Sequence, residues 1–319
     1  MPAGGALFST EPELRSVGHD LERPECVLAC ASGRLFMSDG RGGVTTIAPD
    51  GTESRIGQSS LVPNGIALCR DGSFLVANLS PAGGVWRIGA DGQVTLLLQE
   101  VDGRLLPRVN FVGLDMLERI WICVSALATE DAYPIHAKTG FIALVDKAGT
   151  RIVADGLQYT NECRIDAACR YLYVNETFGR RLTRFAIAED GALRDRETFA
   201  EFSPGDFPDG LTLDVDGGLW VVCVGSNRIY RVGQDRQVET VLDDSIPATV
   251  AKLEAAFESD TLSRPALSSA TGRRLRNASS LAFGSSDLRT AYLGCLNGTS
   301  LASFRSPVAG LPQVHWNWS

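Results

Sequence analysis

The fold is decided by a stretch that begins Val62-Pro63-Asn64-Gly65, runs through Ile66-Ala67-Leu68, turns at Asp71-Gly72 and ends in the strand-like run Ser73–Asn78. This unit of one small polar cluster, two apolar runs and a glycine-containing turn recurs along the chain. The other copies begin at Arg23-Pro24-Glu25-Cys26, Arg108-Val109-Asn110-Phe111, Tyr159-Thr160-Asn161-Glu162, Phe207-Pro208-Asp209-Gly210 and Arg276-Asn277-Ala278-Ser279. The chain therefore contains six similar units.

The spacing of the units predicts a β-propeller. Glu22, Asn64, Asn110, Asn161 and Asp209 are separated by 42, 46, 51 and 48 residues. A period of about 40–50 residues with several short strands in each unit is typical of propeller blades. We therefore expect an all-β, six-bladed propeller that forms a single domain over residues 1–319. Residues 1–15 are expected to pair with the last blade, because this closes the ring without leaving a free sheet edge.

Two segments interrupt this rhythm. The longer one spans residues 245–274, and within it Pro247–Glu258 has a helical composition after a proline near its start. We expect a short helical insertion before the last blade, either a rim or lid over one face or a helix that only covers a blade. The third unit contains a smaller excursion at residues 128–139 that could contribute to a pocket wall.

Composition excludes several classes of function. The 319 residues carry a net charge of −8 with a pI near 5.0, which argues against a nucleic-acid partner. No apolar run is long enough for a membrane span, and the first residues lack the pattern of a signal peptide, so we expect no membrane partner and a cytoplasmic location. None of the eight cysteines forms a Cys-x-x-Cys motif. We expect free, mostly buried thiols that pack as small apolar groups.

The polar clusters predict a metal site on the propeller axis. The first strand of every blade lines the central channel, so equivalent positions converge there. Each cluster taken alone would be read as a turn. Together they would bring carboxylates and amides to one point, where the carboxylates would repel each other unless a cation neutralised them. Oxygen ligands favour Ca²⁺, with Mg²⁺, Mn²⁺ or Zn²⁺ as substitutes. The three histidines are far apart in the sequence, which argues against a histidine-based zinc site.

Four short motifs, in order, resemble those of the regucalcin (senescence marker protein) and gluconolactonase family of calcium-dependent six-bladed propellers. They are Glu22-Arg23-Pro24, Arg108-Val109-Asn110, Thr160-Asn161-Glu162 and Pro208-Asp209-Gly210-Leu211, and the resemblance covers about residues 17–304. The resemblance implies that Glu22, Asn161 and Asp209 are the metal ligands. It implies that Asn110 is a further ligand or a substrate contact, and that Arg108 orients the substrate.

The motifs depart from the family pattern at two places, which affects the expected substrate more than the metal. Where the family has Asn-Asp-Gly, this chain has Asn110-Phe111-Val112, and Thr160-Asn161-Glu162 replaces Pro-Asn-Gly. Glu162 could be a second acid in the site or an ion-paired side chain. Two further asparagines, Asn78 and Asn175, follow strand-like runs and could be turn caps or pocket residues.

The chemistry implied is opening of a small lactone, most simply a sugar lactone. A metal polarises the ester carbonyl, Asp209 acts as general base and Arg108 holds a substrate oxygen. Glu162 is the second candidate for the base. The sequence has no Gly-x-Ser-x-Gly elbow and no phosphate-binding glycine motif. The alternatives are a phosphotriester hydrolase resembling diisopropyl-fluorophosphatase, an enzyme of non-hydrolytic ring chemistry resembling strictosidine synthase, and a calcium-binding protein that captures a ligand without catalysis.

Overall fold

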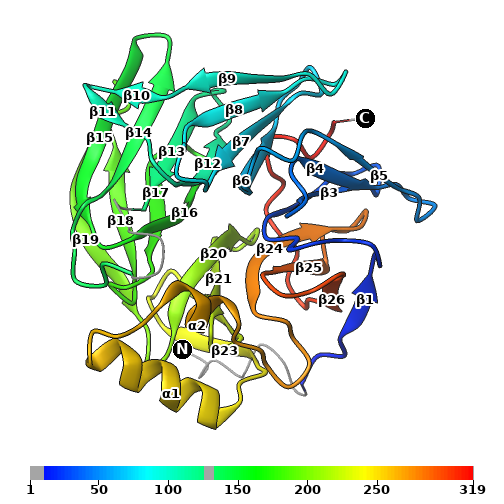
Figure 1. Cartoon of the computed structure of the whole chain (residues 1–319), viewed down its shortest axis with the longest axis vertical. Helices are drawn as coiled ribbons and strands as arrows, with labels where there is room; N and C mark the ends of the chain where they lie inside the picture. Colours follow the sequence, from blue (N-terminus) through cyan, green and yellow to red (C-terminus); the bar gives the residue numbers. More distant parts are fainter. Residues whose placement is uncertain (1–10, 126–132, 319) are drawn as a thin grey trace.

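Six four-stranded antiparallel sheets surround a common axis in the computed structural model, which describes residues 11–125 and 133–318. The six-bladed all-β architecture predicted from the repeats is thereby confirmed (Figure 1). Blade 1 consists of β2 (Val27–Ala29), β3 (Leu35–Ser38), β4 (Val44–Ile47) and β5 (Glu53–Ile56). Blade 2 consists of β6 (Pro63–Leu68), β7 (Phe74–Asn78), β8 (Val85–Ile88) and β9 (Val94–Leu98).

The next three blades follow in chain order. Blade 3 consists of β12 (Val109–Leu114), β13 (Ile120–Val124), β14 (Gly140–Asp146) and β15 (Gly149–Leu157), and the hairpin β10 (Glu100–Val101) and β11 (Arg104–Leu105) precedes it. Blade 4 consists of β16 (Thr160–Ile165), β17 (Tyr171–Glu176), β18 (Arg181–Ile187) and β19 (Leu193–Glu201). Blade 5 consists of β20 (Phe207–Leu213), β21 (Leu219–Val224), β22 (Arg228–Val232) and β23 (Val238–Asp243).

Blade 6 combines both ends of the chain. Its first three strands, counted from the axis, are β24 (Ala278–Gly284), β25 (Thr290–Cys295) and β26 (Leu301–Arg305). The outermost strand is β1 (Arg15–Val17), which pairs antiparallel with β26. The predicted closure by the N-terminal segment is therefore present. The pairing strand begins at Arg15, while residues 1–10 of the predicted segment lie outside the described residues.

The apolar core lies between neighbouring sheets. Residues from blades 2 and 3 form one cluster, including Leu75, Val85 and Ile122, and blades 5 and 6 form another around Trp220. The indoles of Trp121 and Trp220 are fully buried, and each donates its Nε1–H to an aspartate, Asp115 or Asp214, at 2.9 Å. All eight cysteines are free and six of them are buried, as the sequence predicted.

The segment at 245–274 forms two helices, α1 (Pro247–Glu258) and α2 (Arg264–Ser268), drawn beside blade 5 in Figure 1. The predicted helical range coincides with α1, which begins at its proline. Leu253 of α1 and Leu267 of α2 pack against Phe178 and Phe207. Arg180 pairs with Glu254 at 2.7 Å and ties α1 to blade 4. Within the described ranges, no helix is both long and apolar enough to cross a membrane.

Candidate metal centre and pocket

The inner strand of a blade is the one nearest the propeller axis. In five of the six blades, the pairing register of this strand shifts where the polar residue of the repeat stands. The ladder shifts between Pro63 and Ile66, Val109 and Phe111, Thr160 and Cys163, Pro208 and Leu211, and Ala278 and Ser280. A bulge leaves one residue unpaired and re-aims its side chain. The local irregularity therefore frees Asn64, Asn110, Asn161, Asp209 and Ser279 from the ladder, and we call these residues and their blade 1 equivalent the ring positions.

A second local feature identifies the ring position of blade 1. Arg108, Tyr159 and Asn277 have φ values of 48°, 62° and 63°, and each precedes its ring position by two residues. Arg23 has the same left-handed conformation at 45°. Few residues other than glycine adopt this conformation, so its recurrence marks equivalent points of the repeat. Two residues after Arg23 comes Glu25.

The structure therefore corrects the assignment of Glu22. Glu22 is exposed, and its backbone carbonyl accepts a hydrogen bond from Gly40 N at 2.6 Å in a loop of blade 1. Glu25 is only 2% exposed and lies with the other ring positions. The resemblance of Glu22-Arg23-Pro24 to a family motif placed the glutamate three residues too early, because similarity over three residues does not fix the register.

Hydrogen bonds within the protein orient the ring side chains. Asn64 Nδ2 donates to Glu25 Oε1 at 3.1 Å and to the Asn110 carbonyl at 2.9 Å. The Asn64 Oδ1 atom accepts from Arg23 Nη2 at 2.8 Å. Across the channel, Asn161 Nδ2 donates to Thr177 Oγ1 at 3.0 Å. Both polar atoms of Asn64 are thus used, whereas Glu25 and Asn161 each keep one oxygen, Oε2 and Oδ1, without a hydrogen-bond partner among the described residues.

The remaining oxygens are the donor set of a hard cation. In the part of the chain that the structure describes, Glu25 Oε2, Asn161 Oδ1 and Asp209 Oδ1 are buried without a hydrogen-bond partner. Unsatisfied buried oxygens are costly, and two carboxylates with one amide match what Ca²⁺ or Mg²⁺ coordinates. No group of three His, Cys, Asp or Glu side chains suited to a metal occurs among the described residues, so a metal here requires the amide of Asn161.

Burial and mutual repulsion dominate the electrostatics of the ring. Desolvation raises the pKa of Glu25 to about 8, with Arg23 opposing and Glu162 adding to the rise. Burial, together with Glu25 and Glu162, raises the pKa of Asp209 well above its usual value. Burial also raises the pKa of Glu162. These carboxyl groups hold their protons more strongly than in water, and a cation would stabilise their ionised forms.

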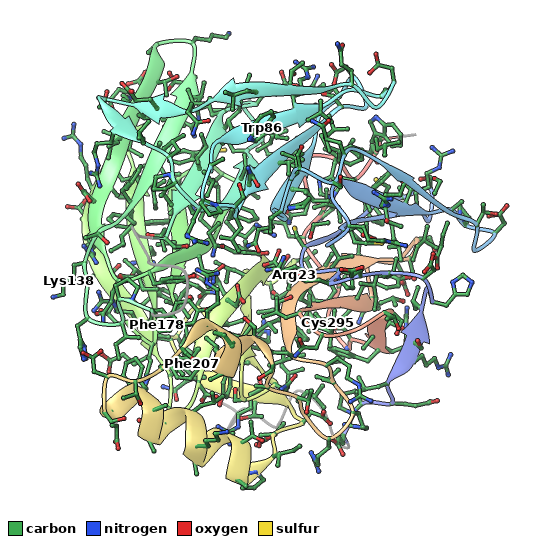
Figure 2. The ribbon with its side chains drawn as sticks, viewed as in Figure 1. Arg23, Trp86, Lys138, Phe178, Phe207 and Cys295 are labelled. Atoms are coloured by element: carbon green, nitrogen blue, oxygen red, sulfur yellow. The ribbon has the colours of Figure 1, made fainter. Side chains whose placement is uncertain are left out.

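The ring opens into a small cavity of about 50 Å³. Tyr133, Tyr159 and Phe178 form an aromatic wall, with ring centroids 4.6–5.5 Å apart. Arg264 and Leu267 of α2 line it from the insertion, and Arg23 lines it from blade 1. Figure 2 shows Arg23 near the centre of the propeller and Phe178 and Phe207 toward α1. Tyr133 lies within the predicted 128–139 excursion, of which residues 128–132 lie outside the described residues.

The other predicted residues take different places. Asn161 and Asp209, which the sequence places at equivalent points of the repeat, line the same cavity, and Asn110 lies beside Asn64. Arg108 is half-buried, and its Nη1 is 3.4 Å from the carbonyl of Leu79, a residue that lines the cavity. Glu162 is ion-paired with Arg164 at 3.0 Å and accepts from Leu211 N. These contacts, which use Oε2, favour the ion-paired interpretation, while Oε1 of Glu162 is buried without a hydrogen-bond partner among the described residues.

The structure shows different roles for Asn78 and Asn175, each of which could be a turn cap or a pocket residue from its sequence. Asn78 caps a turn, since its Oδ1 accepts from Val62 N and its amide donates to the Gly83 carbonyl. Asn175 donates to the carbonyls of Asp209 and Gly210 at 3.0 and 3.1 Å, so it supports the backbone of a ring residue. Sequence reasoning missed Arg23, Glu25 and Arg264 as pocket residues. The left-handed residue that precedes the ring positions of blades 1, 3, 4 and 6 cannot be read from residue types alone.

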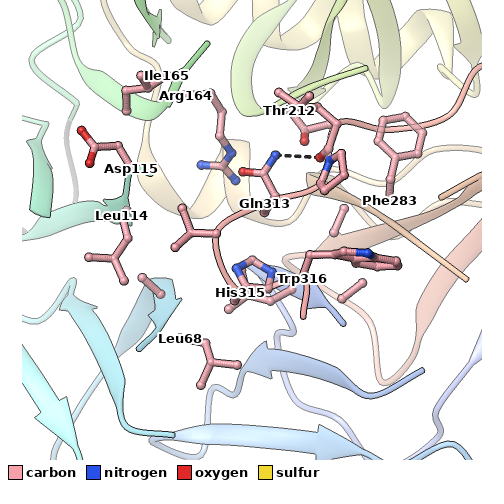
Figure 3. A pocket seen from close by; sticks show the side chains of 18 of the residues that line it. Leu68, Leu114, Asp115, Arg164, Ile165, Thr212, Phe283, Gln313, His315 and Trp316 are labelled. Atoms are coloured by element: carbon pink, nitrogen blue, oxygen red, sulfur yellow. Dashed lines mark hydrogen bonds between the residues drawn. The ribbon is translucent and has the colours of Figure 1, made fainter. Parts of the chain in front are cut away.

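A larger cavity of about 270 Å³ lies at the opposite ends of the inner strands. It is mostly apolar, and the C-terminal segment 311–316 contributes one wall. Figure 3 shows Arg164, Gln313 and His315 facing this space, with Gln313 donating to the Leu311 carbonyl at 3.1 Å. The unpartnered oxygens of Glu25, Asn161 and Asp209 do not belong to it, so the smaller cavity is the candidate site.

Comparison with known proteins identifies the family and supports the fold. The model of the SMP-30/Gluconolactonase/LRE-like region matches residues 24–251. A 6-deoxy-6-sulfogluconolactonase from Pseudomonas putida is 27% identical over 190 residues, which are 58% of this chain and 62% of that protein. The chain thus spans less than two thirds of the length of this relative.

Two solved structures share the fold. A gluconolactonase from Xanthomonas campestris has a TM-score of 0.69 at 21% identity, covering 96% of this chain and 99% of that one. Regucalcin from Agrobacterium tumefaciens, named a calcium-binding protein, has a TM-score of 0.66 at 16% identity, covering 99% and 97%. At these identities the structures support the fold, whereas the matched family model covers most of the chain. The chain belongs to the SMP-30/gluconolactonase/LRE-like family.

Proposed function

We propose that the protein is a metal-dependent hydrolase that opens a small, sugar-derived lactone, with Ca²⁺ as the preferred metal. The observation that carries the proposal is the convergence of three buried, unpartnered oxygens from Glu25, Asn161 and Asp209. These residues would hold the cation. When bound, it would supply Lewis-acid polarisation of the ester carbonyl.

The protein's own groups would perform the remaining steps. Asp209 would accept a proton from the attacking water, because its raised pKa makes it a stronger base once it is ionised. Arg108 at the rim would hold a substrate oxygen through its planar guanidinium, and Asn110 would contact the substrate or add a ligand. The aromatic wall of Tyr133, Tyr159 and Phe178 would exclude bulk water.

Two names among the similar proteins support a lactone substrate, since both are lactonases. The similar structure named a calcium-binding protein supports a second candidate, in which the cation is held and a ligand captured without catalysis. The presence of Arg23 and Arg108 near the ring favours the enzyme, because a purely structural ion needs no cation beside it.

A lactone-hydrolysis screen with and without a chelator tests the proposal. Glu22 and Glu25 give a matched pair, because both are glutamates of the same loop and only Glu25 is buried. We expect Glu25→Gln to abolish metal-dependent hydrolysis and Glu22→Gln to leave it intact. Equal loss in both variants, or hydrolysis that survives complete removal of divalent metal, would refute the assignment.

The base is tested separately at saturating metal. Asp209→Asn keeps an oxygen ligand and removes basicity, whereas Glu162→Gln changes a residue behind the ring. We expect the first variant to lose turnover. If Asp209→Asn turns over normally and Glu162→Gln does not, the base is Glu162. If no lactone, ester or phosphotriester is hydrolysed with any divalent metal, the binding protein is the better description.

A further inference from the structure

Arg264 is a cation in the site that has no acidic partner among the described residues. Its guanidinium lies 5.0 Å from the centre of the Tyr133 ring, and its Nε is buried without a hydrogen-bond partner among the described residues. Within the same described ranges, no carboxylate lies at ion-pair distance from it, although it is within hydrogen-bonding range of Tyr159. Arg264 is half-buried, and a charge that is partly removed from water is usually paired with an opposite charge.

Other half-buried arginines of the protein show the contrast. Arg180 pairs with Glu254 at 2.7 Å, Arg231 with Asp214 at 2.7 Å and Arg228 with Asp206 at 3.2 Å. In each of these pairs the carboxylate belongs to the protein. Arg264 instead has aromatic neighbours and points to the cavity that contains the ring oxygens. A negatively charged ligand would supply the counter-ion that the described residues do not provide.

The balance of charge in the site agrees with an anionic ligand. A divalent cation would offset the negative charges of Glu25 and Asp209, and Arg164 offsets Glu162. Arg23 and Arg264 then remain as two positive charges that line the same cavity. Arg23 already donates to Asn64 and to the Pro63 carbonyl, so Arg264 has the larger unused hydrogen-bonding capacity.

We propose that Arg264 recognises an anionic substituent of the substrate, a carboxylate, sulfonate or phosphate, at a point away from the ester group. The inference rests on the proposed lactonase function for the identity of the rest of the ligand. A guanidinium binds all three groups through paired N–H donors, which gives both affinity and orientation. Arg264 is thus a specificity-determining residue contributed by the insertion.

The small volume of the cavity limits which ligands can enter it without a movement of the protein. About 50 Å³ accommodates a cation and a few waters but is smaller than a six-carbon lactone needs. The cavity must therefore widen when the substrate enters, and the side chains that line it include Arg264 and Leu267 of α2. An arginine at this position would contact the anionic group of a substrate held in the widened cavity.

Calorimetry with calcium-loaded protein tests the anion site without catalysis. D-gluconate carries one carboxylate, and D-glucarate, 6-phosphogluconate and 6-sulfogluconate each carry a second anion at the far end. We expect the second anion to tighten binding by ~10²-fold in the natural protein. Arg264→Met should remove this increment, and Arg264→Lys should retain part of it. The three acids show which anion is preferred.

The matched control is Arg273→Met, which removes an exposed arginine of the same insertion that does not line the cavity. The Arg273→Met variant should keep the full increase in affinity that the second anion gives. An unchanged increment in Arg264→Met would refute the proposal, as would equal binding of gluconate and all three dianions by the natural protein. Melting temperatures establish that the variants are folded. If Arg264→Met is unfolded, the same comparison is made with Arg264→Gln.

Kinetics separates the failure of this inference from failure of the proposed function. The ratio of kcat/KM for a lactone with a charged substituent to that for its neutral analogue should fall by ~10²-fold in Arg264→Met, mainly through KM. Hydrolysis with no preference for the charged lactone would retain the lactonase and reject the anion site. A binding increment without any hydrolysis would retain the anion site and reject the lactonase.

Discussion

Replacing Glu25 by Gln should stabilise the metal-free protein even though it destroys the proposed metal site. Burial raises the pKa of Glu25 from 4.5 to about 8, so the folded state keeps this proton to a higher pH than the unfolded chain. The contribution of Glu25 to the free energy of unfolding is close to zero below pH 4.5. This contribution becomes more unfavourable to the folded state as the pH rises toward 8. At ~1.4 kcal/mol for each pH unit, the cost reaches ~3 kcal/mol at pH 7.

The substitution removes this cost because an amide carries no charge, while Oε1 can still accept from Asn64. With ~2 °C per kcal/mol for a chain of this length, the melting temperature of the metal-free protein should rise by ~5 °C at pH 7. At pH 4.5 the two proteins should melt together. Calcium at 100 times its Kd should add ~2.7 kcal/mol to the natural protein and nothing to Glu25→Gln.

The assay is thermal unfolding from pH 4.5 to 8, with a chelator and with excess calcium, and Glu22→Gln is the control. Because Glu22 is exposed, its substitution should leave both the pH dependence and the calcium effect unchanged. A Glu25→Gln protein that melts no higher than the natural one at pH 7 without metal would refute the burial argument. A variant that calcium still stabilises would refute the metal assignment.

Three further predictions concern turnover and stability. Asp209→Asn should lower turnover at saturating metal by ~10²–10⁴-fold in a hydrolysis assay, and near-normal turnover would rule out its role as base. Burial lowers the pKa of His315 to about 4, so the free energy of unfolding should fall as the pH drops from 6.5 to 4. We expect a loss of ~1–3 kcal/mol, since His315 is only half-buried. The His315→Gln variant should lose this pH dependence in denaturant titrations. Asp214→Ala leaves both the buried Trp220 donor and the paired Arg231 without their acceptor and should cost ~3–5 kcal/mol in the same titrations. Substitution of the exposed Asp287 by Ala should cost much less, and equal losses would contradict the ranking.

The six blades could be predicted from the sequence because each unit repeats a local signal. Strand-forming runs alternate with glycine and aspartate turns, and these preferences act within a few residues. The location of Asn161 and Asp209 in one cavity could be predicted for the same reason, since each stands at one register of the repeat. The helix Pro247–Glu258 was visible from its composition, whereas α2, with five residues, is too short to give a periodic signal.

The errors in the site arise from information that no short stretch contains. Glu22 and Glu25 are both glutamates near one proline, and only the left-handed conformation of Arg23 shows which of them reaches the axis. Arg264 lies far along the chain from Tyr133, and their contact exists because the insertion folds over the cavity. Contacts of this kind depend on where a segment docks, which residue types do not specify.

The pairing of β1 with β26 also has a consequence for synthesis of the chain on the ribosome. Residues 15–17 are synthesised well before their partner strand at residues 301–305. At ~5–20 residues per second, the first strand leaves the ribosome ~15–60 s before its partner. During that interval the pairing of β1 with β26 cannot form, so the closure of the ring has to follow the synthesis of β26.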